Sequence, residues 1–169
     1  LMKMGLNDIQ LNATLIQNLY TKVLVDTEIS EPNNNSAKTV QRHYLGNNQS
    51  HICIIVNEEK SPLINDADLE FLTNILSACN LSLADIVLLN SCSNPKPLYA
   101  GICKEFSPKI IILFGVAPTD AGIPMEFPPY KLQNYNEQFF LIAPLLSTLK
   151  NNKEEKGKLW VCLQSLFKQ

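Results

Sequence analysis

The chain has few of the side chains that hold phosphate groups or metal ions. Arg42 is its only arginine, His43 and His51 are its only histidines, and the formal net charge is -2. Proteins that grip a phosphate backbone usually present clustered arginine and lysine. The composition therefore argues against tight binding of nucleic acid and leaves only a weak or indirect contact with DNA.

Paired cysteines, which mark zinc sites and disulfide frameworks, are also missing. The cysteines stand singly in apolar segments, and their odd number suits a protein that stays reduced in a cytoplasm. We expect them to act as small core side chains, and we expect neither a metal nor another cofactor. They are Cys53, Cys79, Cys92, Cys103 and Cys162.

Long hydrophobic runs are absent as well, because no apolar stretch reaches the roughly 18 residues that a membrane span requires. The sequence therefore predicts a cytoplasmic protein without a membrane contact. With 46% hydrophobic and 18% charged residues, the chain contains enough apolar material for one buried core.

Three segments follow one another along the chain. Residues 1–27 have the spacing of an amphipathic helix, residues 28–50 form an Asn-rich linker or loop, and residues 51–169 form an α/β domain. The first helix either folds back on the domain or binds another protein. Its candidate partner-binding residues are Leu6, Ile9, Ile16 and Tyr20.

The α/β domain begins with alternating strand and helix patterns. Apolar runs of strand length at 51–57, 84–90 and 109–115 are separated by helical patterns at 65–79 and 96–106. Alternation of this kind predicts right-handed crossovers and a parallel sheet with both faces covered.

The remaining residues predict a loop, a hairpin and two helices. Four prolines in 116–131 forbid a helix there, and a hairpin is expected to turn at 134–136. Pro144 opens a short helix, and Asn152 caps the last one. Trp160, the only tryptophan, is expected to pack on the sheet rather than against a base.

Several polar or small residues follow the predicted strands directly. In an open parallel sheet, ligands bind beyond the carboxyl ends of the strands, so these positions form the candidate cleft. The candidates for binding a base or another ligand there are Asn57, Asn90, Ser91, Ala143 and Pro144, with Glu58 and Glu59 next to them.

Three motifs in this order resemble the uracil-DNA glycosylase superfamily. "IVLLNSC" resembles the family's strand that ends in a base-reading asparagine, here Asn90, and "SPKIIILFG" resembles a later strand. "FLIAPLLSTLKNNKEEKGKLWVCL" is similar to its "HPS" segment and the helix after it. Over residues 51–167, the resemblance implies a three-layer α/β sandwich around a central, mostly parallel sheet of about four strands.

The two catalytic motifs of that family are not reproduced. "VNEEKSP" stands where the family has a turn such as "GQDPY", so Asn57 replaces a glycine. In "APL", Ala143 replaces the histidine that stabilises the departing base. The resemblance therefore implies the glycosylase shape without its chemistry. Asn90 is then either a retained base reader or an asparagine that satisfies nearby backbone groups.

A second resemblance concerns the psi subunit of bacterial DNA polymerase III, a glycosylase-like family without an active site. "APLLSTLKNNKEEKGKLW" is similar to the C-terminal stretch of that family. The family reaches the clamp loader through an N-terminal peptide, and residues 1–27 occupy a comparable place. The implied partners are clamp-loader or other replication subunits.

Two functions remain open on these grounds. The first is a noncatalytic protein-interaction component of DNA replication or repair. The alternative is a divergent uracil-DNA glycosylase in which Glu58 or Glu59 activates water, Asn90 reads the flipped base, and Met125 or Phe127 supplies an apolar wedge. A nucleotide-binding domain is disfavoured because no glycine-rich loop follows the first strand.

Overall fold

The computed structural model describes residues 41–168. The chain divides into two compact units, residues 1–39 and residues 40–169, and the described residues belong to the second. The predicted N-terminal helix and most of the predicted linker lie outside the described residues. So do Leu6, Ile9, Ile16 and Tyr20.

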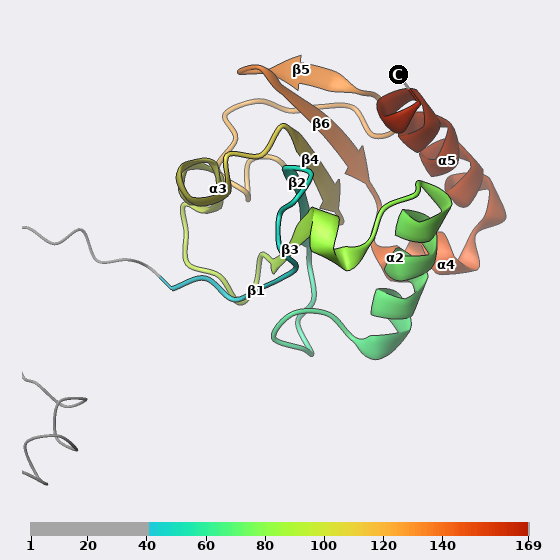
Figure 1. Cartoon of the computed structure of the whole chain (residues 1–169), viewed down its shortest axis with the longest axis horizontal. Coiled ribbons are helices and arrows are strands. Elements are labelled where there is room, and N and C mark those ends of the chain that lie inside the picture. The colour runs from blue at the N-terminus through green and yellow to red at the C-terminus, as the bar shows by residue number, and fades with distance from the viewer. Residues whose placement is uncertain (1–40, 169) are drawn as a thin grey trace, which may run out of the picture. The chain divides into compact units, whose positions relative to one another are not determined.

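Six strands form one mixed sheet in the order β1-β3-β2-β4-β6-β5 (Figure 1). Neighbours among β3, β2, β4 and β6 pair in parallel, whereas β1 and β5 pair antiparallel at the two edges. The strands are β1 (Tyr44–Leu45), β2 (Ile52–Val56), β3 (Ile86–Asn90), β4 (Ile110–Phe114), β5 (Gln133–Tyr135) and β6 (Gln138–Ala143).

The predicted α/β class is confirmed, but the prediction of a mostly parallel sheet of about four strands is wrong. β5 and β6 are joined by a tight hairpin, and a hairpin forces antiparallel pairing. Its turn residues Asn136 and Glu137 have φ values of 53° and 61°, the left-handed conformations that two-residue hairpin turns need. The second antiparallel strand, β1, comes from the segment predicted as linker.

Residues 41–50, part of the segment predicted as a linker or loop, belong to the same compact unit as the sheet. β1 pairs with β3, and Asn94 holds the backbone just before β1 from both sides. The His43 amide donates to Asn94 Oδ1 at 2.9 Å, and Asn94 Nδ2 donates to the His43 carbonyl at 2.9 Å. A two-residue strand has no apolar periodicity, so the sequence pattern did not reveal it.

The only arginine of the chain is used at this junction. Arg42 Nη1 donates to the Pro95 carbonyl at 3.1 Å, and its Nε lies 3.4 Å from a carboxylate oxygen of Glu105. The guanidinium rests on Gly101, where a side-chain carbon would overlap it. Because the Arg42 side chain is only 6% exposed, it is tied to the fold and is not presented to a phosphate.

Helices cover both faces of the sheet (Figure 1). On one face lie α2 (Asp66–Ala78), α4 (Leu146–Asn151) and α5 (Lys153–Phe167), and on the other lies α3 (Leu98–Phe106); a short 3-10 turn, η3 (Leu83–Asp85), precedes β3. All five residues of β2 are buried, because successive side chains enter the two opposite cores. Of the described helices, none is both long and apolar enough to cross a membrane.

The long proline loop between β4 and β5 is irregular, as predicted, but it is anchored. Ala121 and Ile123 are buried in the core on the α3 side of the sheet. The Tyr99 amide, in α3, donates to the Ala121 carbonyl at 2.8 Å. The loop therefore completes the cover of the face that α3 covers only in part.

Trp160 does not lie where the sequence placed it. The last helix begins after Asn152, whose side chain accepts from the Glu154 and Glu155 amides, and it buries Leu159 and Leu163 against the sheet. Trp160 is 36% exposed and faces the space between α5 and α2. The prediction that it packs on the sheet was wrong, because its neighbour Leu159 takes that position.

The cysteines follow their prediction only in part. Cys53 is fully buried, Cys92 is exposed, and the other three are half-buried; all five thiols are free. Burial raises the pKa of the Cys53 thiol strongly, and the neighbouring Cys103 raises it further. Within residues 41–168, no group of His, Cys, Asp and Glu is arranged to hold a metal ion.

Candidate functional site

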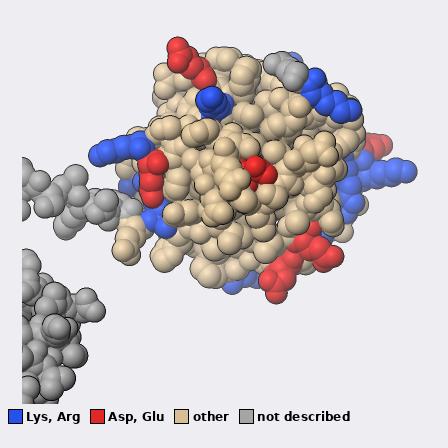
Figure 2. Space-filling model, in the orientation of Figure 1, with Lys and Arg blue, Asp and Glu red and all other residues tan. Residues whose placement is uncertain are grey.

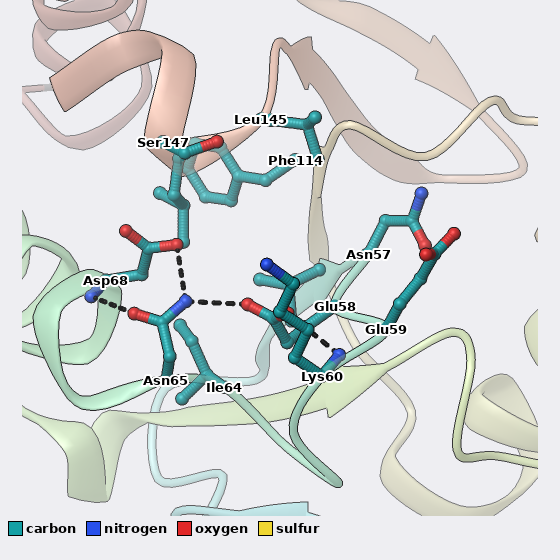
Figure 3. A pocket seen from close by; sticks show the side chains of 12 residues that line it. Asn57, Glu58, Glu59, Lys60, Ile64, Asn65, Asp68, Phe114, Leu145 and Ser147 are labelled. Atoms are coloured by element: carbon teal, nitrogen blue, oxygen red, sulfur yellow. Dashed lines mark hydrogen bonds between the residues drawn. The ribbon is translucent and has the colours of Figure 1, made fainter. Parts of the chain in front are cut away.

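A cleft opens beyond the carboxyl ends of the central strands (Figure 3). Val56 pairs with Asn90 on one side and with Phe114 on the other, so β2, β3 and β4 end at the same edge of the sheet. The cavity volume is about 440 Å³. Its lining residues are Val56, Asn57, Glu58, Glu59, Lys60, Ile64, Asn65, Asp68, Phe114, Leu145, Leu146 and Ser147.

One wall of this strand-end cleft is a chain of polar side chains at the start of α2 (Figure 3). Asn65 caps the helix, with its Oδ1 accepting from the Asp68 amide at 2.9 Å. Its Nδ2 donates to Glu58 Oε2 at 2.6 Å and to Asp68 Oδ2 at 2.9 Å. Lys150 Nζ, from α4, lies 3.0 Å from Asp68 Oδ1. These groups therefore satisfy one another across three segments of the chain.

The two glutamates of the cleft differ in their surroundings. Glu58 uses both carboxylate oxygens, because Oε1 accepts from the Lys60 amide at 3.0 Å while Oε2 accepts from Asn65. Glu59 is exposed, and Figure 3 shows it beside Asn57, away from that network. Asn57 accepts a hydrogen bond from the Cys92 thiol at 2.9 Å. Glu59 is thus the freer of the two carboxylates.

Asn90 is completely buried and does not line the cleft. Its Oδ1 accepts from the Glu58 and Cys92 amides, both at 3.1 Å. Its Nδ2 donates to the Glu58 carbonyl at 2.7 Å and to the Ser61 carbonyl at 2.9 Å. A side-chain amide has two acceptor sites and two N–H donors, so all four are engaged. Asn90 therefore ties the end of β3 to the turn after β2, the structural interpretation of this residue.

The opposite wall comes from the turn after β6 and carries Leu145, Leu146 and Ser147. Ala143 is only 3% exposed and belongs to the core, and its carbonyl accepts from the Gly115 amide at 2.9 Å. Leu145 is 39% exposed and lines the cleft. Gly115, with φ of 66°, lies so close that a side-chain carbon there would overlap Leu145. This wall offers mainly packing, and the Ser147 hydroxyl is its polar group.

The structure thus separates the residues predicted at the strand ends. Asn57, Glu58 and Glu59 line the cleft, whereas Asn90, Ser91, Ala143 and Pro144 do not. The Ser91 amide is used in a hydrogen bond to the Val56 carbonyl at 2.9 Å. Whether a residue lines the cleft depends on the direction that the chain takes after each strand.

Several lining residues carry no ligand-site signal in the sequence. Asn65 and Asp68 carry helix-capping signals, and only the folding of α2 against the turn after β2 turns them into cleft residues. Leu145 and Ser147 follow β6 by two and four residues. Both lie within four residues of the strand end, so a rule that includes those residues would predict them.

The charges around the cleft do not suit a phosphate. The lining carries the carboxylates of Glu58, Glu59 and Asp68 and one lysine, Lys60. Lys150, the other nearby cation, is paired with Asp68. Phosphate recognition needs clustered cations or free backbone amides, so the cleft disfavours a DNA strand at its mouth.

A second polar cluster lies at the first turn of α5. Lys158 Nζ donates to Glu155 Oε1 at 2.8 Å, and the Tyr130 hydroxyl donates to Glu155 Oε2. Two hydrogen bonds lower the pKa of Glu155 below its usual value of 4.5: the larger effect comes from Lys158 and the smaller from Tyr130. Burial, followed by the bond to Glu155, raises the pKa of Tyr130. This cluster fastens the residues before β5 to α5.

No protein-family model matches the chain, and no curated protein matches it either. The resemblance to the glycosylase superfamily and to the psi subunit therefore rests on the sequence motifs and their order.

Proposed function

We propose that the chain contains a noncatalytic domain of the uracil-DNA glycosylase-like type, a three-layer α/β sandwich, that acts as a protein-interaction component in DNA replication or repair. The observation that carries the proposal is the side chain of Asn90. It stands where the resembled family has its base reader, yet all its hydrogen-bonding groups are used inside the fold. A base cannot be read by an amide that has no free donor or acceptor.

The residue types at Ala143 and Leu145 support the same proposal. A glycosylase stabilises the charge that develops on the departing base with a placed donor, and loss of such a donor costs about 3 kcal/mol, or roughly a hundredfold in rate. Ala143 has a buried methyl group at that place. The acidic lining adds to this, since Glu58, Glu59 and Asp68 repel the phosphates of a DNA substrate.

The kind of partner follows from the resemblance to the psi subunit. In that family a glycosylase-like domain without an active site joins the clamp-loader assembly through an N-terminal peptide. By that likeness, residues 1–27 of this chain reach the clamp loader or another replication subunit. The domain of residues 40–169 then serves as the folded body of the component.

Base release is the first test. The full chain, in excess over uracil-containing single- and double-stranded DNA, is expected to release no uracil in a single turnover. Matched samples of Glu58→Gln and Glu59→Gln should behave identically to the unmodified chain. Release that disappears in either variant would overturn the noncatalytic proposal.

Partner capture is the second test. Immobilised full chain is expected to retain purified clamp-loader subunits from the same organism. A double variant in the predicted first helix, Ile9→Asp with Ile16→Asp, should lose this capture, because both positions belong to its apolar stripe. Retention of no replication subunit by the unmodified chain would count against the proposal.

A divergent glycosylase is the second candidate, and one observation favours it. Glu58 and Glu59 both line the strand-end cleft, and Glu59 is exposed in it, so a carboxylate is available to activate water. Met125 is 45% exposed and offers an apolar wedge. The base-release test separates the candidates, since only the second predicts activity that depends on Glu58 or Glu59.

A further inference from the structure

An apolar groove separates α2 from α5 on the outer side of the helical layer. Its apolar lining is Phe71, Ile75 and Ala78 from α2 with Leu159, Trp160 and Leu163 from α5. α4 packs against both α2 and α5. Among the described residues that line it, only Asn74 and Lys156 are polar. We call this feature the α2–α5 groove.

The groove continues into a smaller hollow toward the end of α5. The two share Ala78, Trp160 and Leu163. The second adds Cys79, Asn80, Gln164, Phe167 and Lys168, so it is more polar than the groove. Trp160 therefore lies at the junction of a path that follows both helices. Side chains at spacings of three and four along two neighbouring helices form the kind of channel into which a third helix packs.

The apolar lining of the groove favours an anchoring side chain over a polar small molecule. Its cavity volume is about 260 Å³, and the hollow beyond it adds about 50 Å³. Small-molecule sites usually place several polar groups around the ligand, whereas among the described residues that line the groove only Asn74 and Lys156 are polar. A shallow apolar channel with a half-exposed tryptophan is instead typical of the centre of a protein-binding surface.

The charges at the groove select among peptides. Lys156 lies over the Phe71 ring, with its Nζ 5.4 Å from the ring centroid, and Lys168 stands at the far end. Within the part of the chain that the structure describes, no carboxylate lines the groove or the hollow. On the face drawn in Figure 2, side chains of both signs are scattered and form no continuous basic patch. The complementary occupant has an apolar face flanked by acidic residues.

We propose that the α2–α5 groove binds an acidic amphipathic helix of a partner protein, which inserts apolar side chains beside Trp160 and places carboxylates near Lys156 and Lys168. This inference rests on the proposed function, because it gives a site to the interaction component. A nucleic acid is a poor fit, since two separated lysines and an apolar floor provide no track for a phosphate backbone.

The test uses the full chain and a synthetic peptide of about fifteen residues, long enough for four helical turns. The peptide carries leucine and phenylalanine at helical spacing, glutamate on both flanks, and no tryptophan. Trp160 is the only tryptophan of the chain, so its emission reports occupancy directly. We expect saturable binding of the acidic peptide and at least about tenfold weaker binding of a control with lysine at every glutamate position.

Variants locate the binding surface. Trp160→Ala is expected to weaken binding of the labelled acidic peptide at least about tenfold, as measured by fluorescence anisotropy. The matched control is Val161→Ala, because Val161 is 63% exposed on the same helix yet does not line the groove; its effect should stay below about twofold. In the double variant Lys156→Glu with Lys168→Glu, the preference should reverse toward the basic peptide.

Four outcomes would overturn the proposal. The first two are equal binding of both peptides and no effect of Trp160→Ala. The third is preferential binding of single-stranded DNA at the groove. The fourth is a dimer of the full chain that dissociates on Trp160→Ala, because a second copy would then be the occupant. Capture of clamp-loader subunits that survives Trp160→Ala, with no peptide binding, would refute the groove and leave the proposed function standing. Peptide binding as expected together with uracil release would refute the proposed function alone.

Discussion

The strand-end cleft and the α2–α5 groove differ in how much of their binding capacity the fold itself uses. The cleft is the larger of the two, but Glu58, Asn65 and Asp68 satisfy one another along its wall. The groove is smaller and leaves Trp160 partly exposed without a polar network around it. A larger hollow is therefore not the better binding site when its polar atoms already have partners.

The two hollows also differ in which features of the fold single them out. The cleft lies where an open α/β sheet usually binds ligands, yet Asn90 behind it serves the fold. The groove lies between helices at a place that no strand-end rule selects. Charge and exposure point to the groove, and topology alone points to the cleft.

Replacing Asn90 is expected to have the largest effect on stability. Asn90→Ala leaves the Glu58 and Cys92 amides and two carbonyls without their partner, so we expect the free energy of unfolding to fall by about 3–4 kcal/mol. Urea unfolding followed by circular dichroism measures it. The control Asn57→Ala, at an exposed residue, should cost under about 0.5 kcal/mol. A loss below 1 kcal/mol in Asn90→Ala would contradict a structural role.

Two neighbouring residues on α5 should differ in how much they contribute to stability. Leu159 is 2% exposed and belongs to the core, so Leu159→Ala should lower the free energy of unfolding by about 3 kcal/mol. Trp160 is 36% exposed and its removal would leave no enclosed cavity, so Trp160→Ala should lower it by less, about 1–2 kcal/mol. Thermal and urea unfolding of the two variants side by side give the ratio. Equal losses would mean that Trp160 supports the fold and is not held available for a partner.

The apolar wall of the cleft provides the third prediction. Gly115→Ala places a carbon against Leu145 at a φ of 66°, and we expect it to cost about 2 kcal/mol. Leu145→Ala removes the overlap, so the double variant should recover part of that loss, with the rest due to the left-handed backbone. Additive losses in a double-mutant cycle of urea unfolding would show that the two residues do not touch.

The smallest effect is expected from the polar cluster at the start of α5, outside both hollows. Because the pKa of folded Glu155 lies below its usual 4.5, its carboxylate contributes stability that is present above pH 4.5 and is lost as the pH falls through the folded pKa. Urea midpoints of the unmodified chain and Glu155→Gln should therefore converge in acid.

Residues with local signals were predicted well. Continuous apolar runs indicated β2, β3 and β4, since strands covered on both faces need apolar residues at every position. Capping residues indicated the starts of two helices, because Asn65 and Asn152 bond to amides only two or three residues ahead. The hairpin at Asn136 was equally local. Each of these features is decided within a few residues of the chain.

Features that depend on distant partners were not predictable in the same way. The segment of β1 has no strand pattern of its own, and it forms a strand because it pairs with β3 and is hydrogen-bonded to Asn94. The candidate cleft residues were predicted from their positions at strand ends. Position alone does not distinguish Asn57, which lines the cleft, from Ser91, which does not. The direction of a turn is set by the contacts it makes, and those come from elsewhere in the chain.

The sequence by itself determined the α/β class, the buried strands, the helix starts and the scarcity of cations, because periodicity, capping and composition act locally. Two features depend on tertiary contacts: the turn after β2 engages the hydrogen-bonding groups of Asn90, and Trp160 faces a groove instead of the sheet. The physical reason is that a side chain has only a few hydrogen-bonding and packing faces. Which of them remain free depends on residues brought together by folding, about thirty positions away for the turn around Glu58 and Ser61.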